Sequence, residues 1–320
     1  MRIENYAPFR RFGCLRLNVK LGRFISAIAA LWLATALPAQ ERGASMGLSQ
    51  EELAYTETLS QAKTFEQTQA SSTVPGTPLK TTTSTNLIGI GGVNLLDTYL
   101  SPETYRGTEL RFFNETQWRR DGKKWGAVMI NQGNVSLAKN RADNAKFLTA
   151  MYDFAYGKLR NFSLADGRLR FQAGGIIDAN LGVIYSTRNG NNPAQMKAWV
   201  SIGPLVAAEY DFTLWSKLFT IRYEAQAPLA GLLFSPNYGQ SYYEIFSRGN
   251  YDHNIVPVTI FSQPSLRHSL TIDIPIKKSL KIRAGYMGDW QQAKVNNLKY
   301  HSRSNLFVIG ITRQFKIFNL

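Results

Sequence analysis

Residues 169–185 read LRFQAGGIIDANLGVIY, and this stretch decides the fold class. Its odd-numbered residues are all apolar or glycine, whereas its even-numbered residues include Arg170, Asp178 and Asn180. Side chains of a β-strand point alternately to its two faces, so the pattern predicts a strand with one apolar and one polar face. Globular strands average about 5–6 residues, and this one is far longer.

The same alternation recurs along the chain from residue 85 onward and predicts an all-β fold. Candidate strands lie near residues 86–97, 106–119, 124–137, 145–160, 167–186, 195–212, 217–227, 239–248, 254–262, 266–276, 279–291 and 303–318. Single-chain bacterial barrels have even strand numbers, so we predict a transmembrane antiparallel β-barrel of about twelve strands, with ten as the alternative. Residues 227–264 are the least regular, since four prolines interrupt them.

A soluble β-sandwich is the competing architecture, because it also alternates. Aromatic residues near the ends of the candidate strands favour the barrel, since membrane barrels carry aromatic girdles at both interfaces. These residues are Tyr152, Tyr156, Tyr185, Tyr210, Tyr223, Tyr286 and Trp290. The chain ends in Phe318-Asn319-Leu320 rather than on an aromatic residue, a departure from the usual barrel-assembly signal.

The first 40 residues are typical of an export signal. Six Lys or Arg residues precede an apolar stretch at 24–37. This stretch is shorter than the ~20 residues that a membrane-spanning helix needs. We predict a signal peptide over 1–40, cleaved near Ala39 or Gln40, and a mature protein in the outer membrane. Residues 41–84, rich in Thr, Ser, Gln and Glu, are predicted to form a flexible periplasmic segment, and 85–320 the barrel.

Charge and cysteine content narrow the partners. The chain carries a net charge of +15, but no basic run with interleaved aromatics marks a nucleic-acid site, and export would remove that partner. Expected partners are therefore outer-membrane lipid, the phosphates of lipopolysaccharide, and the barrel-assembly machinery during biogenesis. The oligomeric state is left open. Cys14 lies in the predicted signal peptide, so the mature chain has no thiol for disulfides or metal binding.

Charged residues of both signs lie on the polar face of the candidate strands. We expect them to line the barrel interior as ion pairs, formed by Glu109 with Arg111 and Glu115, Arg170 with Asp178, Arg222 with Glu224, and Arg283 with Asp289. Barrels well below 16 strands leave little aqueous lumen. A general diffusion pore is therefore disfavoured.

Several longer strings resemble a known family. They are Asp97–Pro102 (DTYLSP), Tyr105–Thr108 (YRGT), Asn114-Glu115, Ser235–Phe246 (SPNYGQSYYEIF) and Val295–His301 (VNNLKYH). Together they resemble a family of uncharacterised outer-membrane proteins of Bacteroidetes, classed only as a domain of unknown function. The resemblance covers about residues 85–318 and implies an outer-membrane barrel, with no activity or ligand residues.

One catalytic arrangement is a candidate, because some barrels place a serine hydrolase at the outer rim. A hydroxyl nucleophile needs a base within hydrogen-bond reach and a third group that orients the base. Ser241, His253 and Asn254 are the best set the chain offers, with Glu244 as an alternative orienting group. Against it, no histidine has a serine two residues away on the same strand, as barrel lipases have.

No metal or cofactor is expected, since three scattered histidines and no paired cysteines supply no ligand motif. Gly89, Gly91 and Gly92 lack the Lys-Ser or Lys-Thr of a nucleotide loop. We predict a non-enzymatic envelope component or a narrow solute channel. The alternative is a rim-located lipid hydrolase of the phospholipase or lipid A deacylase type. Between the two, the sequence favours a protein without enzymatic activity.

Overall fold

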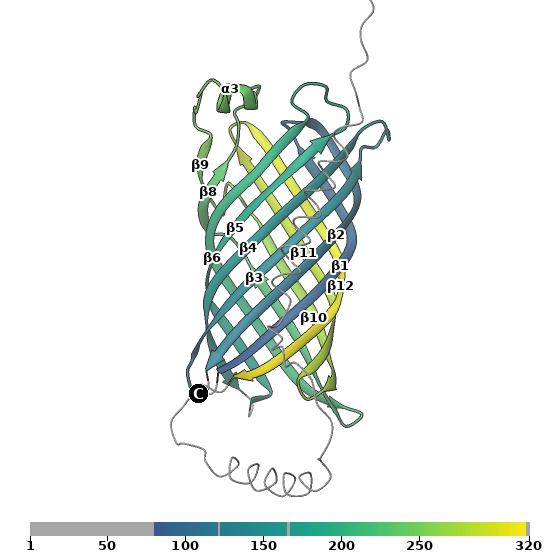
Figure 1. Ribbon diagram of the computed structural model, residues 1–320, viewed down its shortest axis with the longest axis vertical. Helices are drawn as coiled ribbons and strands as arrows, with labels where there is room; N and C mark the ends of the chain where they lie inside the picture. Colours follow the sequence, from purple (N-terminus) through teal and green to yellow (C-terminus); the bar gives the residue numbers. More distant parts are fainter. Residues whose placement is uncertain (1–79, 121, 165–166, 318–320) are drawn as a thin grey trace, which may run out of the picture. The chain divides into compact units, whose positions relative to one another are not determined.

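The computed structural model describes residues 80–120, 122–164 and 167–317, which form twelve β-strands and one short helix (Figure 1). The strands are β1 (Lys80–Asp97), β2 (Ser101–Arg120), β3 (Trp125–Lys139), β4 (Lys146–Leu164), β5 (Leu169–Ser186), β6 (Ala194–Leu214), β7 (Lys217–Gln226), β8 (Ala230–Phe234), β9 (Ile255–Thr259), β10 (Leu266–Lys277), β11 (Leu280–Val295) and β12 (Leu298–Ile317). The helix is α3 (Tyr242–Phe246). The predicted all-β fold is confirmed.

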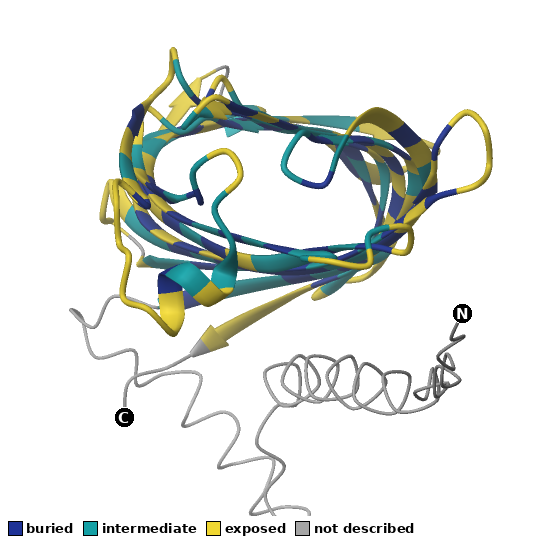
Figure 2. Ribbon diagram, turned by 90° about the horizontal axis from the view of Figure 1, so that it is seen from above, coloured by how far each residue is buried: buried dark blue, intermediate teal, exposed yellow. Residues whose placement is uncertain are grey.

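Ten of these strands close into a ring. Neighbours pair antiparallel in the order β1 to β7, then β10, β11 and β12. The ring closes where β12 pairs with β1 from Lys80 opposite Ile317 to Asp97 opposite Tyr300. Figure 2 shows the ring along its axis, with buried and exposed residues alternating along the strands. The predicted antiparallel barrel is therefore confirmed, with ten strands in the closed ring.

Strands β8 and β9 lie outside the closed ring and extend the sheet along the first half of β6. β8 pairs with Ala198–Ile202 of β6, and β9 pairs with β8. The β6–β8 register is offset by one residue from that of β6 with β7, so Ala227–Leu229 forms a bulge where Pro228 interrupts the ladder. Sequence alternation missed β8, a five-residue strand that lies between Pro228 and Pro236.

The predicted strand at 239–248 is wrong. That segment belongs to the connection between β8 and β9 and contains α3. Ser241 caps the helix by accepting a hydrogen bond from the Glu244 amide, and the Glu244 carboxylate accepts one from the Ser241 amide in return. This reciprocal capping box satisfies amides that a strand would have left for a neighbour, and it favours the helical turn. The other predicted strands each overlap an observed strand.

The two ends of the ring differ in the length of their connections. At the end where β1 begins and β12 finishes, at most four residues separate one strand from the next, between β2 and β3, β4 and β5, β6 and β7, and β10 and β11. At the opposite end the connections include 140–145, 187–193 and the long connection 235–254 that holds α3, drawn at the top of Figure 1. We call these ends the short-turn end and the long-loop end. Outer-membrane barrels show this asymmetry, with the short turns in the periplasm.

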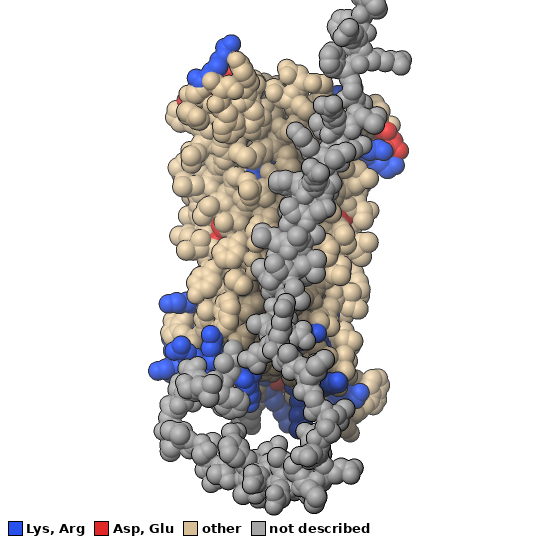
Figure 3. Space-filling view, in the orientation of Figure 1, with Lys and Arg blue, Asp and Glu red and all other residues tan. Residues whose placement is uncertain are grey.

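The outward face of the ring is apolar, the reverse of a soluble protein. On β5 and β6 the outward residues Ile177, Leu181, Val200 and Ile202 are each more than half exposed. All seven aromatic residues predicted for the girdles lie at outward-facing positions of their strands. Figure 3 shows Lys and Arg gathering near the short-turn end, beside a broad band nearly free of charge. An apolar surface this extensive requires an apolar surrounding.

The N-terminal boundary of the barrel differs slightly from its prediction. β1 begins at Lys80, so residues 80–84 belong to the barrel rather than to the predicted polar segment. Thr81 is buried on its inward face and Thr85 bonds Thr312 of β12. The predicted signal peptide and the rest of the polar segment lie outside the described residues. Within the described part of the chain, no helix has both the length and the apolarity to cross a membrane.

Candidate functional site

The interior of the ring is polar and densely packed. Along β2, residues Glu109, Arg111, Glu115 and Gln117 are buried, while the outward residue Leu110 between them is 37% exposed. The same alternation on the other strands points their charged residues into the lumen. These side chains form two groups of ion pairs, one nearer each end.

Arg111 is the first centre of the group nearer the long-loop end. Its Nη2 lies 2.6 Å from Glu109 Oε1, and its Nη1 donates to Asp289 of β11. Ser304 of β12 donates to the second carboxylate oxygen of Glu109 at 2.5 Å. Arg111 is only 3% exposed, so its charge is balanced by carboxylates rather than by bulk water.

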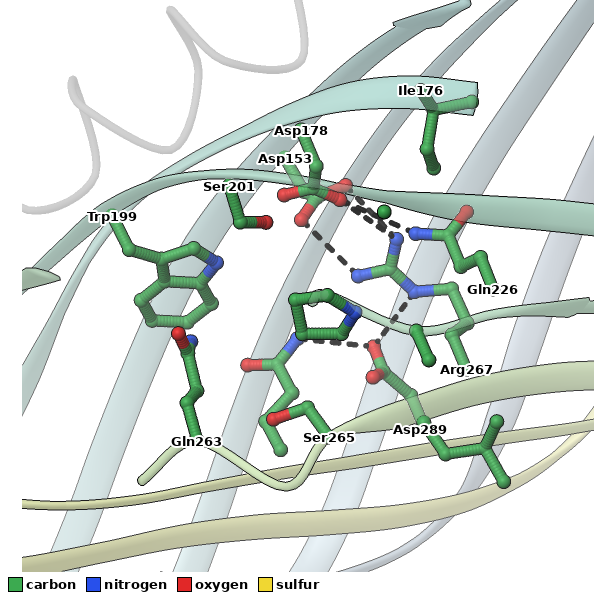
Figure 4. A pocket seen from close by; sticks show the side chains of 15 residues that line it. Asp153, Ile176, Asp178, Trp199, Ser201, Gln226, Gln263, Ser265, Arg267 and Asp289 are labelled. Carbon is green, nitrogen blue, oxygen red and sulfur yellow. Dashed lines mark hydrogen bonds and ion pairs between the residues drawn. The ribbon is translucent and has the colours of Figure 1, made fainter. Parts of the chain in front are cut away.

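Arg267 of β10 is the second centre of the same group (Figure 4). It binds Asp153 of β4 in a bidentate manner, with Nη1 and Nη2 each 3.1 Å from one carboxylate oxygen. Its Nε lies 3.3 Å from Asp289, and its Nη1 lies 3.6 Å from Asp178. A planar guanidinium suits this arrangement, because its donors form a fixed fork that matches carboxylates.

The group nearer the short-turn end is centred on Arg222 of β7. Its Nη2 lies 2.9 Å from Glu115 Oε1 and also donates to Glu224, while Nη1 donates to Glu209. Arg170 of β5 continues the network, with Nη2 3.0 Å from Glu209. Four strands thus share one set of bonds.

Two further charge pairs adjoin this group. Arg170 also binds Asp211, and Arg283 binds Asp273 with Nε 2.6 Å and Nη2 2.9 Å from its carboxylate oxygens. Each pair links neighbouring strands. Asp273 stands directly opposite Arg283 in the β10–β11 register, whereas Asp211 lies two residues beyond Glu209, the residue opposite Arg170 in the β5–β6 register. The lumen wall is thereby tied together from inside near the short-turn end.

Several of these bonds cross the lumen rather than run along its wall. In the ring of ten strands, β7 lies five places from β2, so Arg222 and Glu115 meet from opposite sides. β10 lies four places from β4, and Arg267 joins Asp153 across that span. The cavity beside Arg267 measures about 30 Å³, room for little more than a water molecule. Charged side chains therefore bridge the lumen at two levels.

Nearer the long-loop end, the interior becomes apolar. Tyr105 and Phe147 stack with ring centroids 3.6 Å apart, and Trp199 lies 6.5 Å from Tyr300 in the same buried cluster. Lys197 is held there by Asp97 at 2.7 Å, with its ammonium 4.2 Å from the Tyr300 ring centroid. This cluster adds an apolar layer to the two charged ones.

Two of the predicted ion pairs form and two do not. Glu109 with Arg111 and Arg222 with Glu224 are bonded along their own strands. The predicted pairing of Arg170 with Asp178 is wrong, because eight residues of strand separate them by roughly 26 Å. Glu209 stands directly opposite Arg170 in the β5–β6 register and binds it instead.

The predicted pairing of Arg283 with Asp289 is wrong for the same reason, since six residues of strand span roughly 20 Å. Arg283 pairs across the strand with Asp273, and Asp289 binds Arg111 and Arg267. The predicted ladder omitted five charged residues that share these bonds, namely Asp153, Glu209, Asp211, Arg267 and Asp273. Each occupies an inward position of its strand, a signal already present in the sequence alternation.

The candidate catalytic residues have other partners. Ser241 Oγ donates to Glu244 Oε2 at 3.0 Å as part of the helix cap. The side chain of His253 is 87% exposed, with Nδ1 2.5 Å from Asp252 Oδ1. Asn254 donates to the backbone oxygen of Ser235 and to the side chain of Gln240. Among the described residues, no hydrogen bond joins Ser241, His253 and Asn254 to one another.

No metal centre emerges from the described residues, since they hold no group of three or more His, Cys, Asp or Glu side chains arranged to bind an ion. The acidic side chains of the interior are instead bonded to arginines and amides.

The motif strings at 97–102, 235–246 and 295–301 converge at the long-loop end. Tyr99 Oη donates to the backbone oxygen of Gln240 at 2.9 Å. Asn296 Nδ2 donates to the backbone oxygen of Ser235 at 3.1 Å, and the Lys299 amide donates to Thr98 Oγ1 at 2.8 Å. Residues far apart in the chain thus form one ordered cap of loops.

A closed antiparallel ring with an apolar outer face and a charged, bridged interior defines an outer-membrane type of β-barrel. The chain belongs to the family described as "Protein of unknown function (DUF3316)", whose profile matches residues 58–320. The resemblance to a family of unknown function that the sequence predicted is therefore confirmed. No curated protein matches this chain.

Several solved structures are similar to this chain at low identity and low TM-score. The transport unit of the autotransporter AIDA-I from Escherichia coli is 9% identical, with 80% of this chain and 98% of that chain covered and a TM-score of 0.38. The outer membrane protease OmpT from Escherichia coli is 7% identical, with 76% of this chain and 98% of that chain covered and a TM-score of 0.37. Neisserial surface protein A is 11% identical, with 73% of this chain and 97% of that chain covered and a TM-score of 0.32.

Proposed function

We propose that the protein is a closed outer-membrane barrel, an envelope component that acts through its surfaces rather than by conducting solute through its lumen. The observation that carries the proposal is the bond between Arg222 and Glu115, which joins opposite sides of the ring. Arg267 with Asp153 repeats this bridge at a second level. A solute would have to displace several buried, mutually bonded charges, each costly to leave unpaired.

The outer membrane is the location that the exterior supports. The ring presents apolar side chains outward on β4, β5 and β6, as a barrel in a bilayer must. Bacterial barrels of this kind require export, so the proposed leader over residues 1–40 and the barrel-assembly machinery belong to the same proposal. The Bacteroidetes origin suggested by the motif strings also belongs here.

Contact with lipopolysaccharide is proposed for the long-loop end, which faces outward if the short turns lie in the periplasm. Exposed cations surround that end and would neutralise lipid phosphates. They include Arg106, Lys139, Arg141, Lys146, Arg188 and Lys299.

Conductance tests the closed lumen. Native protein reconstituted in planar bilayers should give no single-channel steps, after envelope fractionation and a faster-migrating unboiled band on a gel have verified a folded outer-membrane barrel. A variant that removes both bridges, with Glu115, Arg222, Asp153 and Arg267 all changed to alanine, should conduct. Regular steps from the native protein would contradict the proposal.

A matched control also removes an ion pair without changing the net charge, but it leaves the lumen intact. Lys139 and Asp143 form a pair at 2.7 Å on the rim, with side chains 58% and 56% exposed. The variant with both changed to alanine should stay as silent as the native protein. If it conducted like the lumen variant, the increase would come from loosened folding rather than from loss of the bridges.

A further inference from the structure

The long-loop end contains a cleft whose lining differs from the rest of the protein surface. It lies between the β1–β2 turn, the 187–193 loop and the 235–254 connection, and measures about 360 Å³. This volume falls within the about 300–1,000 Å³ of small-molecule sites. None of its twelve lining residues is charged, although the chain carries 37 Lys or Arg and 22 Asp or Glu.

The lining consists of amides, hydroxyls and tyrosine rings. Asn189, Asn191 and Asn192 stand on one side, and Tyr99 and Tyr238 contribute rings from the other loops. An amide side chain offers both a donor and an acceptor, and a tyrosine offers an apolar ring face with a polar tip. This composition resembles that of binding loops that combine rigid aromatic contacts with adaptable hydrogen bonds.

Hydrogen bonds between lining residues from different loops hold the walls of the cleft in place. Tyr99 donates to the backbone of Gln240, and Asn189 Nδ2 donates to the backbone oxygen of Leu100 at 2.9 Å. Gln240 itself accepts from the Asn237 amide at 3.0 Å, which closes the turn that presents Tyr238. A preformed site loses less entropy when a ligand binds.

The groups that face the cleft keep free bonding capacity. No hydrogen bond within the described chain involves the side chains of Asn191, Asn192 or Tyr238, and Tyr238 is 76% exposed. An exposed ring with unpaired amides beside it suits a ligand that has both apolar faces and many hydroxyls. Charged ligands are disfavoured, since the cleft contains no counter-charge to replace their lost hydration.

We infer that this cleft binds a neutral oligosaccharide, with a sugar ring stacked on Tyr238 and its hydroxyls bonded by Asn191 and Asn192. The inference rests on the proposed function in one respect, that the long-loop end faces the outside of the cell. It adds a ligand class to a barrel whose lumen is closed. The family motif strings at 97–102 and 235–246 supply two of the three walls.

Binding of the native, detergent-solubilised protein to a microarray of neutral and anionic glycans tests the inference. Neutral glycans should be retained in preference to sialylated or sulfated ones. Changing Tyr238 to alanine should lower the affinity for the best-bound neutral glycan by roughly tenfold or more, measured by calorimetry, as expected for an aromatic contact residue. Tyr238 to phenylalanine should keep most of the affinity, because the ring face remains.

Tyr251 provides the matched control, since it is 66% exposed in the same connection and does not line the cleft. Its change to alanine should leave the affinity unchanged. Retention of no neutral glycan, preference for anionic glycans, or equal binding by the Tyr238 and Tyr251 alanine variants would each overturn the inference. Conductance reads out the closed lumen separately, so a conducting protein that still binds neutral glycans would refute only the proposed function.

Discussion

Replacing Arg222 with methionine is the sharpest test of the bridged lumen. Arg222 is 3% exposed and bonds Glu115, Glu209 and Glu224. Methionine removes the charge but fills much of the same space, so little of the effect would arise from a cavity. The variant therefore isolates the role of one buried cation.

The expected loss of unfolding free energy is about 3–5 kcal/mol, the usual cost of leaving a buried charge without its partner. Glu209 would keep Arg170, at 3.0 Å, and Glu115 would keep its bond from Gln117. Glu224, 8% exposed, has Arg222 as its ion-pair partner and would bear most of the cost.

Urea titration of the protein in lipid vesicles, followed by tryptophan fluorescence, would measure this loss. Changing Lys139 to alanine breaks an exposed rim pair and should cost about 0.5 kcal/mol or less. A cycle that combines the Arg222 variant with Glu115 to glutamine should show a coupling above about 0.5 kcal/mol, because the two residues touch. A loss below about 1 kcal/mol for the Arg222 variant would mean that the carboxylates reach water, and it would refute the bridged lumen.

Two further predictions concern the strands and the loops. A Cβ at Gly107 would lie 1.9 Å from the backbone oxygen of Leu137. Changing Gly107 to alanine should therefore destabilise the barrel by about 1–3 kcal/mol in the same titration. Gly92 has open space around it and should tolerate alanine. The hydrogen bonds from the backbone and hydroxyl of Ser241 lower the pKa of the Glu244 carboxyl, so the cap's stabilisation is complete above the ordinary carboxyl pKa and is lost as pH falls through the lowered value. The hydrogen-exchange protection factors of the α3 amides, in which the pH dependence of the intrinsic exchange rate is divided out, should therefore fall in acid in the native protein but not in a Glu244 to glutamine variant. Equal pH dependence of the protection factors in both proteins would contradict the role of the carboxylate.

The alternation of residues 169–185 was sufficient to predict a long strand with two different faces, and the aromatic residues near the strand ends favoured a membrane barrel over a soluble sandwich. The same rule correctly placed Glu109, Arg111 and Arg222 on the inward side of their strands. It failed where local rules compete, as at Ser241 and Glu244, whose capping box forms a helix in place of a predicted strand. It also missed β8, a five-residue strand between Pro228 and Pro236.

What the sequence determined by itself is the two-faced character of each strand, since that property follows from consecutive residues. The tertiary structure alone decided the ring of ten strands, and with it which strands stand opposite one another. Arg222 meets Glu115 across the lumen because closure brings β2 and β7 face to face, a relation between residues 107 apart in the chain. The loop cleft at 97–102, 187–193 and 235–254 exists for the same reason, since only the closed ring brings these connections to one end.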